Sequence, residues 1–169
     1  MVKAADLVKQ AINGGYIGLP YANIDCQGLV ERILRDAGFS YNWRGSNHMW
    51  REALSERHEE KPDPDKVPAG AWVFTLKHDG TEVRRGYHDN LGAAKHVGLY
   101  LGHNTVIHST SSGSACVCYD DLTSSRWTAW GLCKYVDYSA ECPAEPVTDI
   151  NRALEALEIL KQFIEGRTE

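Results

Sequence analysis

The first third of the chain places its apolar residues three or four positions apart, the spacing of a helix that buries one face. Residues 2–13 follow this pattern and end at consecutive glycines, so we expect a first helix there. A second helix is predicted from Asp25, a good N-cap, to Gly38, and a third from Gly45 to about Ser55.

After a polar loop with several prolines, short runs of β-branched and aromatic residues replace the helical pattern. Strands are expected at residues 71–74, 96–101, 105–108, 115–119 and 128–136. Residues 81–83 follow an Asp-Gly dipeptide typical of hairpins, so we expect a returning strand there. Helices first and a meander of strands afterwards predict an α+β fold, with N-terminal helices packed on an antiparallel sheet of about five or six strands.

The C-terminal end of the chain has a pattern of its own. Residues 139–147 contain prolines, as a linker does, and a helix capped by Asp149 follows, with apolar positions at alternating three- and four-residue intervals. We therefore expect a domain over residues 1–138, a linker over 139–147 and a C-terminal helix in residues 148–169. The apolar stripe of this helix either docks back on the domain or pairs with a second copy, so self-association through it is an open alternative.

Composition and charge narrow the class of protein. With 43% hydrophobic and 24% charged residues, the 169-residue chain has the composition of a globular protein and not of a disordered or fibrous one. Its 18 basic and 23 acidic residues, a net charge of −5, give no reason to expect nucleic acid or an anionic membrane as a partner. No stretch is apolar enough to span a membrane, and the first residues lack the apolar run of a secretory signal. We therefore expect synthesis in the cytoplasm, with no nucleic-acid partner and no membrane partner.

The cysteines indicate neither a disulfide framework nor a metal site. Five is an odd number, and a chain of this length does not need disulfides to hold a core. Cys116 and Cys118 are separated by one residue in a predicted strand, without the spacing or the histidine partners of a zinc site. We predict no metal, no cofactor, and thiols that are mostly buried.

One cysteine and two histidines could together perform nucleophilic chemistry. Cys26 stands at the start of the second predicted helix, where unpaired N–H groups and the helix dipole lower the pKa of a thiol. His96 opens the longest predicted strand, and His108 lies in the next strand after a short turn, so both can face the same side of the sheet. A thiol, an imidazole and a third polar group are what a cysteine nucleophile requires. The alternative is a small residue packed under a helix and two structural histidines.

Four short segments resemble the NlpC/P60 family of cell-wall cysteine peptidases. Residues 25–30, Asp-Cys-Gln-Gly-Leu-Val, are similar to its nucleophile motif, although the family usually has Ser where this chain has Gln. Residues 96–102 resemble its histidine strand, and residues 106–110 the strand that supplies the third polar group. Residues 67–74 stand where the family has Pro-Gly-Asp-Leu-Val-Phe. The resemblance covers about residues 12–138.

The resemblance implies a papain-like α+β domain in which Cys26 is the nucleophile. His96 would be the general base and then the general acid, and His108 would orient His96. The oxyanion would be held by the backbone N–H of Cys26 and by a tyrosine hydroxyl. Tyr21 is favoured for this role because it follows a proline as in the family, and Tyr16 is the open alternative.

Further residues are connected with substrate through the same resemblance. Asp25 has two interpretations, the N-cap of the helix and a carboxylate that binds the free amine of a substrate. Ser46 matches a family position near the substrate subsite. Residues 77–95 form a longer segment than the simplest family members have, and we interpret it as a flap at the rim of the cleft.

The resemblance implies that the protein is a cysteine endopeptidase, which hydrolyses peptidoglycan stem peptides at the γ-D-glutamyl–diamino acid bond. The peptidoglycan stem peptide is then both its substrate and its expected binding partner. One alternative is an N-acetylmuramoyl-L-alanine amidase or another acyl transfer on the same triad. A second is a non-catalytic wall-binding or tail structural module. Without a signal peptide, delivery to the cell wall would be by phage lysis as an endolysin, by a phage tail, or by another route that does not use the Sec system.

Overall fold

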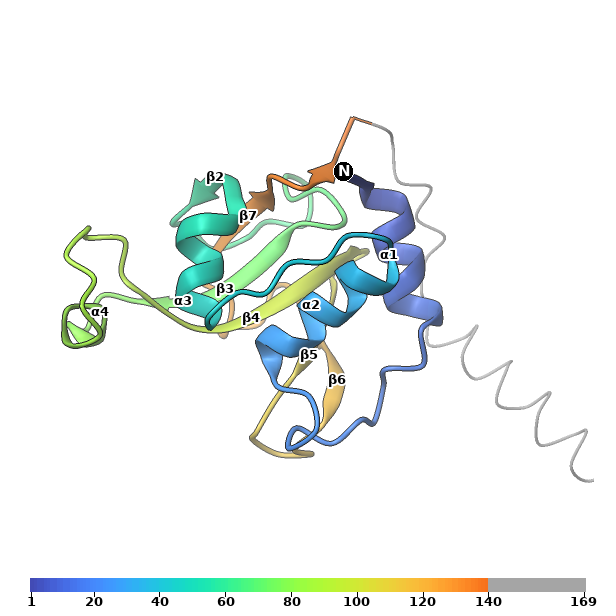
Figure 1. Ribbon diagram of the computed structural model, residues 1–169, viewed down its shortest axis with the longest axis horizontal. Coiled ribbons are helices and arrows are strands. Elements are labelled where there is room, and N and C mark those ends of the chain that lie inside the picture. The colour runs from blue at the N-terminus through green and yellow to red at the C-terminus, as the bar shows by residue number, and fades with distance from the viewer. Residues whose placement is uncertain (140–169) are drawn as a thin grey trace, which may run out of the picture.

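A six-stranded antiparallel sheet forms the centre of the protein, seen here in a computed structural model that describes residues 1–139 (Figure 1). Its strands are β2 (Leu54–His58), β3 (Trp72–Lys77), β4 (Ala93–Gly102), β5 (Thr105–Ser109), β6 (Val117–Asp121) and β7 (Ala129–Cys133). They lie in the order β2-β7-β3-β4-β5-β6, so the long strand β4 runs between β3 and β5. Two short strands, β1 (Val2–Lys3) and β8 (Val136–Asp137), pair in parallel outside this sheet.

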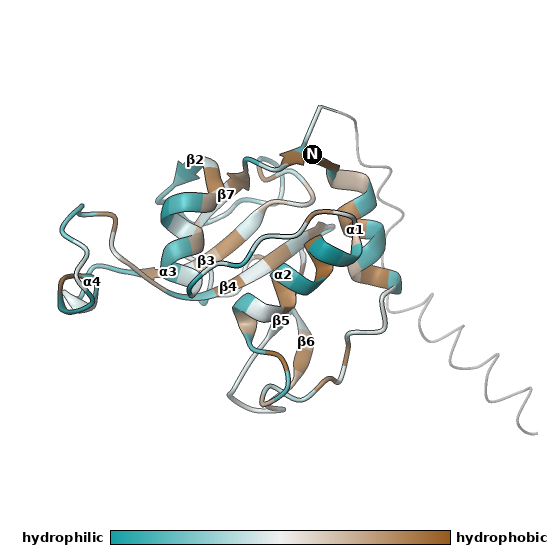
Figure 2. Cartoon of the chain, viewed as in Figure 1, coloured by the Kyte–Doolittle hydropathy of each residue, from teal (hydrophilic) through white to brown (hydrophobic). Residues whose placement is uncertain are grey.

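The longer helices cover one face of the sheet. The helical elements are α1 (Ala4–Asn13), α2 (Cys26–Asp36), α3 (Ser46–His48), the π-helical turn η1 (Met49–Ala53) and α4 (Thr81–Arg84). Figure 1 shows α2 crossing in front of β4, and α4 far out beyond the ends of β3 and β4. In Figure 2, α1 and α2 carry alternating brown and teal bands, as amphipathic helices on a sheet do.

Alternation of side chains along the central strands builds a core on each face of the sheet. Trp72 and Phe74 in β3 join Leu29 and Ile33 of α2 in one cluster, and all four are fully buried. Val73 points the other way, into a smaller cluster on the opposite face. Each large apolar side chain buried in this way stabilises the fold by about 1.5–3 kcal/mol. Helix α2 is therefore packed firmly against this face of the sheet.

The predicted α+β class is confirmed, with N-terminal helices on an antiparallel sheet. The second helix begins where expected, because a carboxylate oxygen of Asp25 accepts a hydrogen bond from the Gly28 N–H at 2.7 Å and caps it. The strands predicted at 71–74, 96–101 and 105–108 are present, although β3 ends three residues later and β4 begins three residues earlier than predicted. The first helix, however, begins only at Ala4, because Val2 instead donates a backbone hydrogen bond to the Tyr135 carbonyl at 2.9 Å.

The predicted strand at residues 81–83 is wrong. These residues lie in α4, because Gly80 adopts a left-handed φ of 73° and an Asp79 carboxylate oxygen accepts a hydrogen bond from the Thr81 N–H at 3.0 Å. Such a local side-chain bond starts a helical turn in place of a two-residue hairpin.

The remaining differences concern element boundaries. The third helix ends at Ala53, and residues 54–58 form β2, an edge strand whose polar residues conceal it in the sequence. The strand predicted at 115–119 starts at Val117, and the one predicted at 128–136 is divided into β7 and β8.

The predicted linker at 139–147, beyond its first residue, and the predicted helix in 148–169 lie outside the described residues. Within residues 1–139, no helix is long and apolar enough to cross a membrane.

Candidate active site

Cys26 is the first residue of α2 and lies against β4. Only 8% of it is exposed, and the backbone N–H of Val97 hydrogen-bonds its thiol. Burial raises the pKa of the Cys26 thiol, although the N–H groups of Val97 and Gln27 act in the opposite direction. The expected lowering of this pKa by the helix start is therefore wrong, because loss of water outweighs the helix terminus. At neutral pH the resting group is a thiol and not a thiolate.

His96 and His108 lie side by side on neighbouring strands, as their spacing predicted. Nε2 of His96 is 2.8 Å from Nδ1 of His108, and the two rings are nearly perpendicular, at 88°. The pairing of Leu99 with Ile107 in β4 and β5 places the two histidines diagonally across the strand pair. The contact uses Nε2 of His96, which leaves its Nδ1 available for another partner.

Both imidazoles are neutral at physiological pH. Burial, followed by the nearby His108 and Arg126, lowers the pKa of His96 to about 3. Burial and Arg126 also lower the pKa of His108 to about 4, against an opposing effect of Asp120. His96 is half-buried and neutral, and it lies next to Val97, whose backbone N–H hydrogen-bonds the buried thiol. An imidazole in this protonation state can act as a base toward a thiol.

The Trp127 ring contacts both histidines on one side, a contact that the sequence analysis did not predict. It stacks on His96, with centroids 5.6 Å apart, and meets His108 edge to face at 5.4 Å. A Cβ atom at Gly98 would stand 2.9 Å from the Trp127 ring, so only glycine lets this strand pass so close. The fully buried tryptophan excludes water from that side of both rings.

The two candidate tyrosines lie in different places. The Tyr16 hydroxyl donates to Asp36 at 2.8 Å and accepts from Gln10 at 2.9 Å. Asp36 and Cys26 stand at opposite ends of α2, about 15 Å apart along its axis. The pKa of Tyr21, by contrast, is raised mainly by burial and next by Cys26. Tyr21 therefore lies close enough to Cys26 to respond to a negative charge on its sulfur. The structure thus brings Tyr21 to the thiol and holds the Tyr16 hydroxyl away from it.

Asp25 faces a surface depression on the outer side of α2. It caps α2 through Gly28 and lines a hollow of about 440 Å³ along the outer side of that helix. Tyr21 borders the same hollow, together with charged residues of α2. The carboxylate can therefore serve both as helix cap and as a partner for a cationic group.

Ser46 hydrogen-bonds the backbone of β4, the strand that contains His96. Its hydroxyl donates to the Ala94 carbonyl at 2.7 Å, and the side-chain oxygen of Asn47 accepts from the Ala94 N–H at 2.8 Å. These two bonds fix β4 two residues before His96. The structure therefore gives Ser46 a backbone partner within the protein at the position where the sequence suggested a substrate contact.

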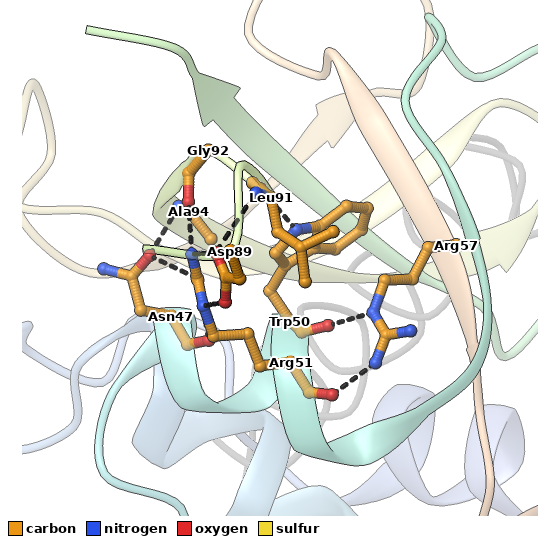
Figure 3. Close-up of polar contacts among 8 residues, drawn as sticks. All are labelled: Asn47, Trp50, Arg51, Arg57, Asp89, Leu91, Gly92 and Ala94. Carbon is orange, nitrogen blue, oxygen red and sulfur yellow. Dashed lines mark hydrogen bonds and ion pairs between the residues drawn. The ribbon is translucent and has the colours of Figure 1, made fainter. Parts of the chain in front are cut away.

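A buried arginine anchors the segment 77–95 at its return to the sheet (Figure 3). Arg51 makes two hydrogen bonds to the Asp89 carboxylate, at 2.6 and 2.8 Å, and one to the Gly92 carbonyl at 2.8 Å. The indole of Trp50 donates to the Leu91 carbonyl at 2.8 Å. A two-pronged arginine–carboxylate pair of this kind fixes orientation as well as distance. The chain that enters β4 is thus held in place while the α4 loop extends outward.

The donor groups of the site suit proton transfer. Within residues 1–139, no cluster of three or more His, Cys, Asp or Glu side chains could hold a metal ion. The arrangement provides a thiol on a helix start, a neutral imidazole pair and a tyrosine near the thiol. It can activate a nucleophile and stabilise an oxyanion.

Comparison with known proteins identifies a family and a shared fold. The sequence pattern described as NlpC/P60 family matches residues 14–136. No curated protein matches the chain. Among solved structures, an NlpC/P60 family protein of Bacillus cereus is 22% identical with a TM-score of 0.52, over 73% of this chain and 39% of its own.

Two mycobacterial structures are also similar. The P60 domain of a Mycobacterium avium subspecies paratuberculosis antigen is 18% identical with a TM-score of 0.53, covering 76% of this chain and 96% of that one. RipB of Mycobacterium tuberculosis, a peptidoglycan hydrolase, is 20% identical with a TM-score of 0.53, covering 80% and 67%. At these identities the likeness establishes a shared fold.

Proposed function

The chain belongs to the NlpC/P60 family, and from that membership we propose that it is a cysteine endopeptidase of bacterial cell walls. It hydrolyses peptidoglycan stem peptides at the γ-D-glutamyl–diamino acid bond. The observation that carries the proposal is the 2.8 Å contact between His96 and His108, on the strand against which the Cys26 thiol is buried. This contact leaves one nitrogen of His96 free to act as a base.

In the proposed reaction, Nδ1 of His96 takes the Cys26 proton as the sulfur attacks the peptide carbonyl carbon. The tetrahedral oxyanion is held by the Cys26 backbone N–H and the Tyr21 hydroxyl. The His96 imidazolium then protonates the leaving amine, and a thioester to the acyl fragment remains. Water, deprotonated by the same imidazole, attacks the thioester and restores the thiol.

Charge separation occurs only during turnover in this mechanism. The pKa of Cys26 is raised and that of His96 is lowered, so the resting pair is neutral. The buried imidazolium is stabilised when it forms, because His108 accepts a hydrogen bond from it. His108 is therefore proposed to orient and support His96 without taking the proton itself.

The substrate end of the proposal rests on Asp25 and Tyr21. Both line the depression on the outer side of α2, and the exposed carboxylate of Asp25, the residue before Cys26, fits the free amine of a stem peptide. A cation-binding carboxylate near the nucleophile favours cleavage within a free stem peptide. An amidase would need a sugar on that side of the scissile bond.

Residues 1–138 are proposed to be the catalytic domain. The Tyr138 hydroxyl accepts a hydrogen bond from the Cys133 N–H and donates to the Gly70 carbonyl, both at 3.1 Å, which ties the end of this region to the sheet. A chain truncated after Ser139 should therefore fold and retain cleavage. Lost cleavage in a folded truncation would place the C-terminal segment in the active site.

Digestion of defined muropeptides tests the proposed bond. We expect mass spectrometry to show an L-Ala-D-Glu fragment and a new amine on the diamino acid, from substrates with either diaminopimelate or lysine. The Cys26→Ala protein is the control and should give no product. Release of the intact stem peptide from muramic acid would instead show an amidase, and no product from the wild-type protein would favour a non-catalytic module.

A further inference from the structure

His108 has a second partner on the side away from His96. Its Nε2 lies 3.5 Å from the Sγ of Cys118, and the two residues are directly paired across β5 and β6. His96, His108 and Cys118 thus form a row across three neighbouring strands, and Cys26 of α2 contacts the first of these strands at Val97. The resemblance to the family names Cys26, His96 and His108, and the role of Cys118 has to be argued from its contacts.

The Cys118 sulfur is suited to accept a hydrogen bond. The residue is half-buried, and burial is the main cause that raises the pKa of its thiol, so the group is neutral at physiological pH. The Ser114 side chain hydrogen-bonds the sulfur and lowers this pKa, as a hydroxyl donor does. A thiol sulfur can accept a further N–H, although weakly.

Charged groups near His108 oppose one another. Arg126 disfavours the charged imidazole and Asp120 favours it, and the two side chains form an ion pair at 3.3 Å. Burial, the largest cause of the lowered pKa of His108, keeps the ring neutral, so it carries one proton, on either Nδ1 or Nε2. The same is true of His96, whose pKa is lowered to about 3.

Two neutral rings in contact allow only two proton arrangements. In one, His96 donates from Nε2 to Nδ1 of His108, and His108 donates from its own Nε2 to Cys118. Nδ1 of His96 then has a free lone pair for the Cys26 proton. In the other, the Cys118 S–H donates to His108, both hydrogen bonds reverse, and Nδ1 of His96 already carries a proton. Only the first arrangement provides a base.

We propose that Cys118 is a positioning residue, whose sulfur accepts the Nε2–H of His108 and so selects the tautomer in which His96 can act as a base. The proposal rests on the proposed function for its consequence in catalysis. Its structural content, the tautomer of both rings, does not depend on which bond is cleaved. The partner of a neutral imidazole determines which nitrogen carries the proton.

The test combines ring nitrogen spectra with kinetics. Protein labelled with ¹⁵N-histidine should show His96 and His108 both protonated at Nε2, with signals assigned through His96→Asn and His108→Asn. In Cys118→Ala both rings should populate a mixture of tautomers, and in Cys118→Ser the wild-type pattern should return. Cys116→Ala, two residues away on the same segment, is the matched control and should leave the spectrum unchanged.

Cleavage provides the second measurement. Cys118→Ala should lower kcat by about 10-fold with KM unchanged, as loss of an outer partner of a functional imidazole does. Cys118→Ser should recover most of this loss, and Cys116→Ala should match the wild type. An Nδ1-protonated His96 in the wild-type protein, or identical tautomers in wild type and Cys118→Ala, would overturn the proposal. If the wild-type protein cleaves no muropeptide, the proposed function fails while the spectra still decide the tautomer.

Discussion

Acidification should destabilise the fold through His96 and His108, whose pKa values are both lowered by burial. The pKa of His96 falls from 6.5 to about 3 on folding, and that of His108 to about 4. Between pH 6.5 and about 4 the unfolded chain therefore binds protons that the native protein does not. Because the unfolded state gains these protons, the free energy of unfolding falls as the pH is lowered, by up to about 1.4 kcal/mol per pH unit for each ring.

The magnitude can be worked out for pH 5. At pH 5, protonation of each histidine in the unfolded chain has lowered the free energy of unfolding by about 2 kcal/mol relative to pH 8. The two histidines together lower it by about 4 kcal/mol. The figure depends little on the folded pKa values, since both lie below 5. Because a domain is typically stable by only about 5–15 kcal/mol, this loss is large. Carboxylates with lowered pKa, such as Asp36 and Asp89, add their own loss only below about pH 4.5, and so contribute little between pH 8 and pH 5.

Urea denaturation at half-unit pH intervals, followed by fluorescence of the buried tryptophans, measures the effect. The His108→Asn protein should lose about half of the pH dependence, because one titrating ring remains buried at His96. His88→Asn, at an exposed histidine, is the matched control and should leave the dependence unchanged. A free energy of unfolding that is constant from pH 7 to pH 5 would refute the conclusion that folding lowers the pKa of both rings and keeps them neutral.

Three sets of variants test the proposed residue roles. Cys26→Ser should abolish muropeptide cleavage with stability changed by no more than about 0.5 kcal/mol, and residual cleavage would reject the nucleophile. His96→Ala should lower kcat/KM by about 10²–10⁴-fold and His108→Ala by less, because only His96 transfers the proton. The opposite ranking would exchange their roles. Tyr21→Phe should lower kcat alone, whereas Tyr16→Phe should remove about 1–2 kcal/mol of unfolding free energy and leave kcat unchanged. Equal kcat values for the two variants would rule out Tyr21 as an oxyanion donor.

The proximity of His96 and His108 could be predicted because their strands are consecutive and the turn is short. Gly102 and the left-handed His103 and Asn104 close that turn, which determines the register between the strands. Local sequence therefore contains nearly all the information that places the two rings together.

Trp127 and Cys118 could not be predicted as neighbours of the same rings. Cys118 reaches His108 through the register of β5 with β6, and the loop between these strands has no length or residue signature that determines a register. Trp127 lies two residues before β7, which is next to β3 and not next to β4. Its stacking on His96 depends on the order of the strands, which an alternating pattern does not reveal.

The pKa of Cys26 shows where a local rule was overruled by packing. The start of a helix favours the thiolate form of a cysteine. The sequence predicted that Cys26 lies at such a start, because Asp25 is a good N-cap. How deeply the thiol is buried depends on the strand that packs against it, here at Val97. The burial that keeps the thiol protonated also keeps His96 neutral, so the two shifts have one cause. A site that excludes water strengthens every later electrostatic contact, and the proposed mechanism therefore requires that His108 and Cys118 be aligned before the charge appears.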